Sequence, residues 1–339
     1  MILVIEIGGT KLQVGLFDPQ SVSLSECVRS RVVAADGAAG ILKQLEGILP
    51  KLLEGRSVSR CGIGFGGPIQ GDGTIFRSHQ ITGWEGFNLS EWTRQKTGVP
   101  TFVANDCDAA ALAEAHYGAG QGVSSMFYVT VGTGVGGGWV SHGRRQGADR
   151  PAVAEIGHLR PGMMCTGEQD TVESYASGRG ITQQVHRLAR EIFRWLEQGR
   201  ISFDSLTEFT HLQLATPSTE DLQQSWDWYQ SFKTSELDTE RVAEAAGQQI
   251  WLAQVALQLA TTTLGWALAQ MVTILAPEKV VVGGGVSKIS PPLFWEPLRD
   301  HFSMYTFGPL CDPSLLVSAA LGDDVVLYGA AAIASTSDA

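Results

Sequence analysis

Residues 2–17 read Ile2-Leu3-Val4-Ile5-Glu6-Ile7-Gly8-Gly9-Thr10-Lys11-Leu12-Gln13-Val14-Gly15-Leu16-Phe17. An apolar run over 2–7, a glycine turn and a second apolar run over 12–17 predict a β-hairpin. The same pattern recurs later in the chain, where the apolar run 126–131 is followed by a glycine turn over 132–138 and a short apolar run over 139–141. Two copies of this strand, glycine turn and strand indicate two halves of similar design.

The segments between and after these hairpins predict an α/β fold. Apolar residues at helical spacing over 41–53 predict a helix. A second helix is predicted near 89–97, and the alanine-rich segment 109–117, which Gly118 ends, predicts a third. Short apolar runs over 61–65 and 101–104 predict strands, and a further strand over 279–282 precedes a final helix over 325–334. Strands that alternate with helices are typical of layered α/β domains.

Composition narrows the class of protein. The chain has 339 residues, of which 44% are hydrophobic, and this predicts about two packed domains rather than disorder. A net charge of −11 argues against nucleic-acid or membrane-surface partners. Five scattered cysteines without a CxxC pair, and an N-terminus without a basic segment, favour the cytoplasm. The uncharged run 251–276 is long enough to span a bilayer, but its regularly spaced polar residues predict a buried helix.

Three glycine turns follow predicted strands and suit the binding of phosphate. Glycine lets successive backbone N–H groups approach an anion closely. The alternative is that these glycines only close hairpins. A dinucleotide-binding motif is excluded because a strand, not a helix, follows Gly132–Gly138, and the Walker motif is missing. The turns are Gly8-Gly9-Thr10-Lys11, Gly132-Thr133-Gly134-Val135-Gly136 and Gly283-Gly284-Gly285.

Asn105 and Asp106 stand between a predicted strand and a predicted helix, where ligands of α/β sheets usually bind. A carboxylate there can accept a proton from a substrate hydroxyl. The alternative is that Asp106 or Asp108 caps the helix. Glu155, His158 and Glu173 add groups that can bond to sugar hydroxyls.

In their order along the chain, these motifs resemble those of the ROK family (repressors, open reading frames, kinases), whose kinases phosphorylate sugars. The resemblance covers nearly the whole chain outside residues 190–238. It is carried by Ile5-Glu6-Ile7-Gly8-Gly9-Thr10-Lys11, Gly66-Gly67-Pro68, Val103-Ala104-Asn105-Asp106, Val131-Gly132-Thr133-Gly134, Glu155-Ile156-Gly157-His158, Glu173 and Val282-Gly283-Gly284-Gly285.

The resemblance implies a two-domain actin-like ATPase (ribonuclease H-like) fold with an interdomain cleft. Residues 1–114 and 323–339 would form the N-terminal domain, because the last helix returns to it. Residues 115–322 would form the larger domain, with a helical insertion at about 190–238. A homodimer is common in the family.

The implied activity is the ATP-dependent phosphorylation of a hexose, most like that of glucokinase, with Asp106 as the general base. The turns over 8–11 and 132–136 would hold the phosphates of ATP, and Gly283, Gly284 and Gly285 would lie near the adenosine. The sugar would be held by Gly67, Asn105, Asp106, Glu155, His158 and Glu173.

Two departures from the family pattern matter. Glu6 stands where the family usually has Asp, so Mg²⁺ would be reached through water. The zinc-binding loop of many members is reduced to His158 and Cys165, too few ligands for a closed site, so we predict no zinc. The same departures leave open a non-catalytic sensor of sugar or nucleotide. A DNA-binding repressor is disfavoured because the chain starts at the first strand.

Overall fold

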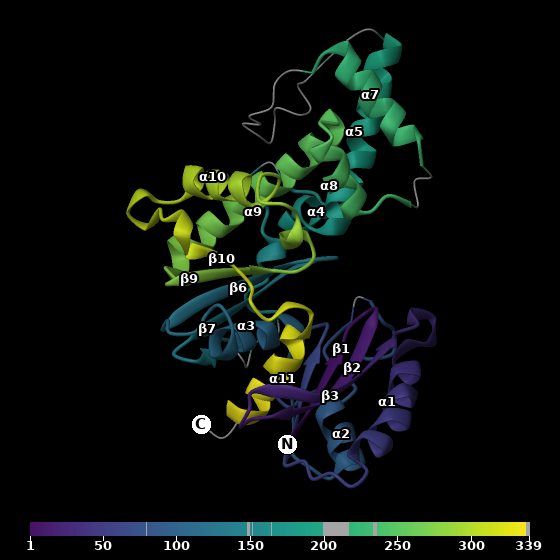
Figure 1. Cartoon of the computed structure of the whole chain (residues 1–339), viewed down its shortest axis with the longest axis vertical. Helices are drawn as coiled ribbons and strands as arrows, with labels where there is room; N and C mark the ends of the chain where they lie inside the picture. Colours follow the sequence, from purple (N-terminus) through teal and green to yellow (C-terminus); the bar gives the residue numbers. More distant parts are fainter. Residues whose placement is uncertain are drawn as a thin grey trace.

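The computed structural model describes residues 1–78, 80–147, 150, 152–163, 165–198, 217–232 and 236–336. Its strands form two five-stranded mixed sheets, and these sheets follow one another along the longest axis of the molecule (Figure 1). Both termini lie beside the first sheet, and helices cover the far side of the second sheet (Figure 1).

The first sheet has the order β3-β2-β1-β4-β5. All six residues of β1 are buried, and five of them are apolar, as is typical of a central strand covered on both faces; the exception is Glu6. β1 pairs antiparallel with β2 and parallel with β4, and this confirms the predicted hairpin. The strands are β1 (Ile2–Ile7), β2 (Lys11–Asp18), β3 (Ser23–Arg31), β4 (Arg60–Phe65) and β5 (Thr101–Asn105).

β3 is not among the predicted elements. The hairpin was predicted to end with the apolar run over 12–17, whereas the chain turns after β2 and adds β3 as an edge strand beside it. No residue of β3 is fully buried, and its sequence Ser-Leu-Ser-Glu-Cys-Val-Arg-Ser-Arg is largely polar. A strand at the edge of a sheet needs no apolar pattern, so periodicity does not reveal it.

The second sheet repeats the first. Its order is β10-β9-β6-β7-β8, so each hairpin (β1–β2 or β6–β7) has two parallel strands on one side and a third antiparallel strand on the other. This confirms the two halves of similar design. The strands are β6 (Ser125–Val131), β7 (Val135–Ser141), β8 (Arg144–Arg145), β9 (Lys279–Gly283) and β10 (Leu316–Ser318).

β7 begins at Val135, four residues before its predicted start, because the glycines over 136–138 belong to the strand. A Cβ at Gly138 would lie 2.6 Å from the Cβ of Ala111. The glycines therefore let α3 (Asp106–Tyr117) pack directly against β7.

Helices lie on both faces of the first sheet (Figure 1). Apolar residues of α1 (Gly37–Leu53) and α2 (Leu89–Thr97) pack in the core of the first sheet. These two helices confirm the helices predicted over 41–53 and 89–97. α3 and α11 (Val325–Thr336) lie between the sheets: α3 contacts β6 and β7, while α11 contacts α3, β1 and β4. The last helix therefore returns to the first sheet; the domain boundaries themselves stay a prediction.

The second sheet is covered by a larger group of helices, with α9 at its centre. α9 is the one helix of the described residues long and apolar enough to cross a membrane, and 83% of its apolar window is buried inside the protein. The helices are α4 (Val172–Ala176), α5 (Gly178–Gln198), α7 (Thr219–Gln230), α8 (Thr239–Gly247), α9 (Trp251–Leu275) and α10 (Trp295–Tyr305).

The predicted insertion at 190–238 lies partly outside the described residues, which omit 199–216 and 233–235. Its described helices α5 and α7 both contact α9.

Single 3₁₀ turns complete the described fold: η1 (Ala34–Asp36), η2 (Ile156–His158), η4 (Val286–Lys288), η5 (Gly308–Leu310), η6 (Pro313–Leu315) and η7 (Gly322–Asp324).

Small residues let α11 approach its neighbours closely. A Cβ at Gly329 would overlap the carbonyl group of Ala109 in α3, and a Cβ at Gly62 in β4 would overlap the carbonyl group of Ala330. Because backbone atoms cannot turn aside as a side chain can, these glycines are required for the packing of α11.

We therefore expect Gly329→Ala to destabilise the protein by about 1–3 kcal/mol, although alanine is the better helix former. Urea denaturation followed by circular dichroism measures this. Gly47→Ala is the matched control, because nothing lies within 4 Å of a Cβ at this exposed site in α1. Equal stability of the two variants would show that α11 does not depend on this contact.

Candidate functional site

A cavity of about 350 Å³ lies between the two sheets and is lined by residues of both. This volume falls in the range of small-molecule sites. Its described lining comprises Glu6, Lys11, Asp106, Cys107, Ala110, Tyr128, Thr130, Gly283, Gly284, Gly285, Ser287, Lys288, Ser318, Ala319, Gly322, Asp323, Val325 and Val326.

Asp106 is the first residue of α3 and lies on the wall of this cavity. Its Oδ1 accepts a hydrogen bond of 2.9 Å from the backbone N–H of Cys107. Burial raises the pKa of Asp106 to about 6; the Cys107 hydrogen bonds oppose this shift, and the charges of Glu6 and Glu155 add to it. Asp106 is thus a carboxylate that gives up its proton just below neutral pH.

The alternative that Asp106 or Asp108 caps the helix is wrong. Asn105 is the N-cap of α3, and its Oδ1 accepts a 2.8 Å hydrogen bond from the N–H of Cys107. Asn105 also donates from Nδ2 to the carbonyl oxygen of Gly67 at 3.1 Å. Asn105 therefore ends β5, starts α3 and holds the loop after β4, and this places Asp106 one residue inside the helix.

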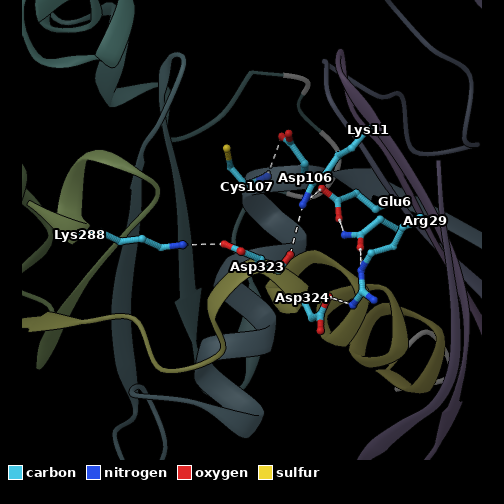
Figure 2. Close-up of polar contacts among 9 residues, drawn as sticks. Glu6, Lys11, Arg29, Asp106, Cys107, Lys288, Asp323 and Asp324 are labelled. Atoms are coloured by element: carbon cyan, nitrogen blue, oxygen red, sulfur yellow. Dashed lines mark hydrogen bonds and ion pairs between the residues drawn. The ribbon is translucent and has the colours of Figure 1, made fainter. Parts of the chain in front are cut away.

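Glu6 and Lys11 form an ion pair beside Asp106, with 2.9 Å between Oε1 and Nζ (Figure 2). The second carboxylate oxygen of Glu6 accepts a 2.6 Å hydrogen bond from Nε2 of Gln13. Burial raises the pKa of Glu6, while Lys11 and Gln13 act in the opposite direction. Both oxygens of Glu6 thus have a partner within the protein.

Asp323 connects the two sides of the cavity. Its carbonyl oxygen accepts a 3.2 Å hydrogen bond from Lys11 in β2, and its carboxylate pairs with Lys288 of η4 at 2.8 Å (Figure 2). Next to it, Asp324 pairs with Arg29 of β3 at 2.7 Å. The start of α11 is therefore tied to both sheets.

Gly283, Gly284 and Gly285 line the cavity as one wall. Gly284 has φ of +90°, a conformation that favours glycine, and a Cβ there would overlap the backbone of Val131. Nothing lies within 4 Å of a Cβ at Gly285. The turn after β9 therefore presents bare backbone to the cavity.

Of the other two glycine turns, Lys11 alone is in the described lining of this cavity. The described lining contains none of Gly8, Gly9, Thr10, Gly132, Thr133, Gly134 or Gly136. A Cβ at Gly66 would lie 3.5 Å from Oδ2 of Asp106 and 3.7 Å from Cα of Gly8, so the first turn and Asp106 converge there. A Cβ at Gly136 would overlap Sγ of Cys107.

Glu173 contacts the second turn. Its Oε2 accepts a 2.9 Å hydrogen bond from the N–H of Val135, and a Cβ at Gly134 would lie 2.5 Å from the same oxygen. The side chain of Glu173 thus fixes the turn that joins β6 to β7.

Asn105 and Glu155 meet in a second cavity of about 20 Å³, room for about one water molecule. Asp108 and Arg145 line it as well and pair at 3.6 Å. Burial raises the pKa of Asp108 to about 6, and Arg145 opposes the shift. The imidazole of His158 is 70% exposed and lies 4.0 Å from the carboxylate of Glu155.

Metal ligands do not gather in the described part of the chain, where no three His, Cys, Asp or Glu side chains form a cluster suited to an ion. Cys165 is buried, and Met164 next to it lies outside the described residues. The expectation of no zinc stays a prediction.

Four residues that line the larger cavity were not predicted as site residues: Tyr128, Thr130, Lys288 and Asp323. Tyr128 and Thr130 alternate on β6 and so share one face of the strand, a signal that period-2 analysis could have used. Lys288 and Asp323 are 35 residues apart and carry no motif, so only the fold brings them together.

Comparisons with known proteins identify the family of this chain. The chain is 32% identical over 305 residues to a glucokinase of Halalkalibacterium halodurans, an alignment that covers 87% of this chain and 83% of the relative. A ROK family glucokinase from Streptomyces griseus, solved in complex with glucose and AMPPNP, shares 26% identity and a TM-score of 0.73 over 98% of this chain and 99% of its own.

The fold extends to a regulator. A ROK family transcriptional regulator, a homologue of the E. coli MLC protein, matches with a TM-score of 0.74 at 20% identity over 98% of this chain and 77% of its own. The likeness to these structures, with the two mixed sheets, shows the α/β two-domain actin-like ATPase fold. The profile of the ROK family matches residues 2–337, and the chain therefore belongs to the ROK family.

Proposed function

We propose that this protein is an ATP-dependent hexose kinase, as the names of its glucokinase relatives suggest. The observation that carries the proposal is that Asp106 lines one cavity together with Lys11 and the bare backbone of Gly283–Gly285. A carboxylate with a pKa of about 6 is ionised at neutral pH and is still basic enough to accept a proton.

Asp106 is the general base in this proposal. As the hydroxyl oxygen of the sugar bonds to the terminal phosphorus of ATP, Asp106 takes the hydroxyl proton and ADP leaves with the electrons of the broken P–O bond. The hydrogen bond from the Cys107 N–H holds the carboxylate in place at the start of α3. Phosphoryl transfer needs little more from a protein than such positioning and the stabilisation of charge.

The residues around the larger cavity fit a nucleotide. Gly283–Gly285 offer backbone without side-chain obstruction, and Lys11 offers a positive charge to the phosphates. We propose the turns over 8–10 and 132–136 as further phosphate contacts. Mg²⁺, when bound with ATP, neutralises phosphate charge. Glu6 fits a contact to it through water, because both of its oxygens are already engaged by Lys11 and Gln13.

The sugar is assigned to the side of Asp106 that faces Asn105 and Glu155. These two residues line the smaller cavity, and Gly67 is joined to Asn105 by a hydrogen bond. His158 lies next to Glu155, and its exposed ring is available to a hydroxyl. We assign Glu173 to the same group, although in this structure it holds Val135.

A non-catalytic sensor is the second candidate, and the occupied carboxylate of Glu6 favours it. A coupled assay with ATP, Mg²⁺ and a panel of hexoses separates the two. The kinase forms ADP with at least one hexose, whereas the sensor gains thermal stability with sugar and forms none.

We expect Asp106→Asn to lower kcat by about 10²–10⁴-fold, because the amide cannot accept the proton. The coupled assay measures kcat, and calorimetry should still detect binding of the sugar. Asp300→Asn, at an exposed site in α10 outside the described linings of both cavities, is the control and should retain most of kcat. Turnover of Asp106→Asn at the rate of the unmodified protein would exclude Asp106 as the base.

We also expect kcat/KM to fall as the pH drops below about 6, because protonation of Asp106 removes the base. Above this pH the carboxylate is ionised and the rate should level off. Rates from about pH 5 to about pH 8 test this. Since Asp108 also has a pKa of about 6, the acidic fall must persist in Asp108→Asn; its loss there would assign the titration to Asp108.

A further inference from the structure

Glu114 lies on α3 two turns beyond Asp106, and none of its side chain is exposed. The chain passes from one sheet to the other directly after α3, over residues 118–124, and returns after β10, over residues 319–321. Both crossings run past Glu114.

The carboxylate of Glu114 binds both crossings through backbone N–H groups. Oε2 accepts a 2.7 Å hydrogen bond from Ala119 in the first crossing. Oε1 accepts bonds of 2.9 Å from Ala320 and from Leu321 in the second. Hydrogen bonds to an ionised acceptor are about twice as strong as neutral ones. One side chain thus ties together segments about 200 residues apart.

Residues of the first crossing pack closely around Glu114 and hydrogen-bond to it. The carbonyl oxygen of Glu114 accepts hydrogen bonds from Gly118 at 3.1 Å and from Gly120 at 2.8 Å. A Cβ at Gly118 would overlap Oε2 of Glu114. Nζ of Lys279 donates to the carbonyl oxygen of Ala119 at 2.7 Å, which fixes the first crossing from the other side.

The second crossing leads directly into the larger cavity. Ala319 and Gly322 flank the two residues bound by Glu114, and both line the cavity with Asp323. Asp323 in turn accepts the hydrogen bond from Lys11. Because Asp106 and Glu114 share one helix, the bonds of Glu114 fix this wall relative to Asp106.

We propose that Glu114 is a positioning residue, which sets the wall formed by Ala319, Gly322 and Asp323 at the separation from Asp106 that nucleotide binding requires. This rests on the proposed function for the identity of the ligand. Glu114 touches neither the cavity nor the residues assigned to the sugar, so its removal should weaken binding of nucleotide and leave binding of sugar unchanged.

Glu114→Gln tests this with little change of shape, since it replaces one acceptor oxygen by an NH₂ group facing a backbone N–H. We expect the Kd for AMPPNP, measured by calorimetry, to rise about tenfold. The reason is that a shift of the wall by a fraction of an ångström weakens its contacts with the nucleotide. The Kd for the hexose should not change. Hydrogen exchange should accelerate in peptides that cover residues 118–124 and 319–324.

Thr262→Val is the matched control for lost stability alone. It removes a buried 2.9 Å hydrogen bond between α9 and His301, and Thr262 lies outside the cavity lining. We expect it to lower Tm without a change in the Kd for AMPPNP. Equal loss of AMPPNP affinity in both variants, or unchanged affinity in Glu114→Gln, would overturn the proposal.

Two measurements on the unmodified protein complete the test. The first applies if Glu114→Gln does not fold. In the unmodified protein, with and without AMPPNP, the backbone amides of Ala119, Ala320 and Leu321 should exchange hydrogen much more slowly than the amide of the exposed Gly122. Exchange at the rate of Gly122 would overturn the proposal. The second is ADP formation: its absence with every hexose would refute the proposed kinase activity. The affinity for AMPPNP does not depend on turnover, so it tests the positioning role of Glu114 separately.

Discussion

The contact between α3 and α11 is the constraint on which the remaining structure depends. The two helices occupy the space between the sheets, and Gly329 against Ala109 allows their backbones to meet. α3 carries Asp106 at its start and packs on the second sheet, while α11 packs on the first. The cavity lies where these helices and the ends of β1 and β9 come together, so its shape follows from the helix contact.

Carboxylates outnumber lysines in the described lining of the larger cavity. Glu6, Asp106 and Asp323 face only two lysines, Lys11 and Lys288, in the described lining. The carboxylate of Glu6 and the carbonyl of Asp323 share Lys11, and this leaves Asp106 without a cationic partner of its own among the described ion pairs. Desolvation then decides its protonation, and the raised pKa follows from that isolation.

The sequence predicted the elements whose pattern is local. Ile2–Ile7 is apolar except for Glu6 because it is buried on both faces, and the first strand of each hairpin was found from such a run. β3 was not found, because an edge strand is paired by its backbone and not by its side chains. At the site, Asp106 was found beside a strand end, but the cap at Asn105 depends on the geometry of one turn. Lys288 and Asp323 meet only through the tertiary fold.

The late position of α11 has a consequence for synthesis on the ribosome. β1 to β5 are complete by Asn105, yet the helix that covers β1 and β4 begins only at Val325. During synthesis, domains generally fold as units, the N-terminal domain first. Here one apolar face of the first sheet stays uncovered until α11 has been made, so this domain cannot be completed before the second sheet and its helices have been synthesised.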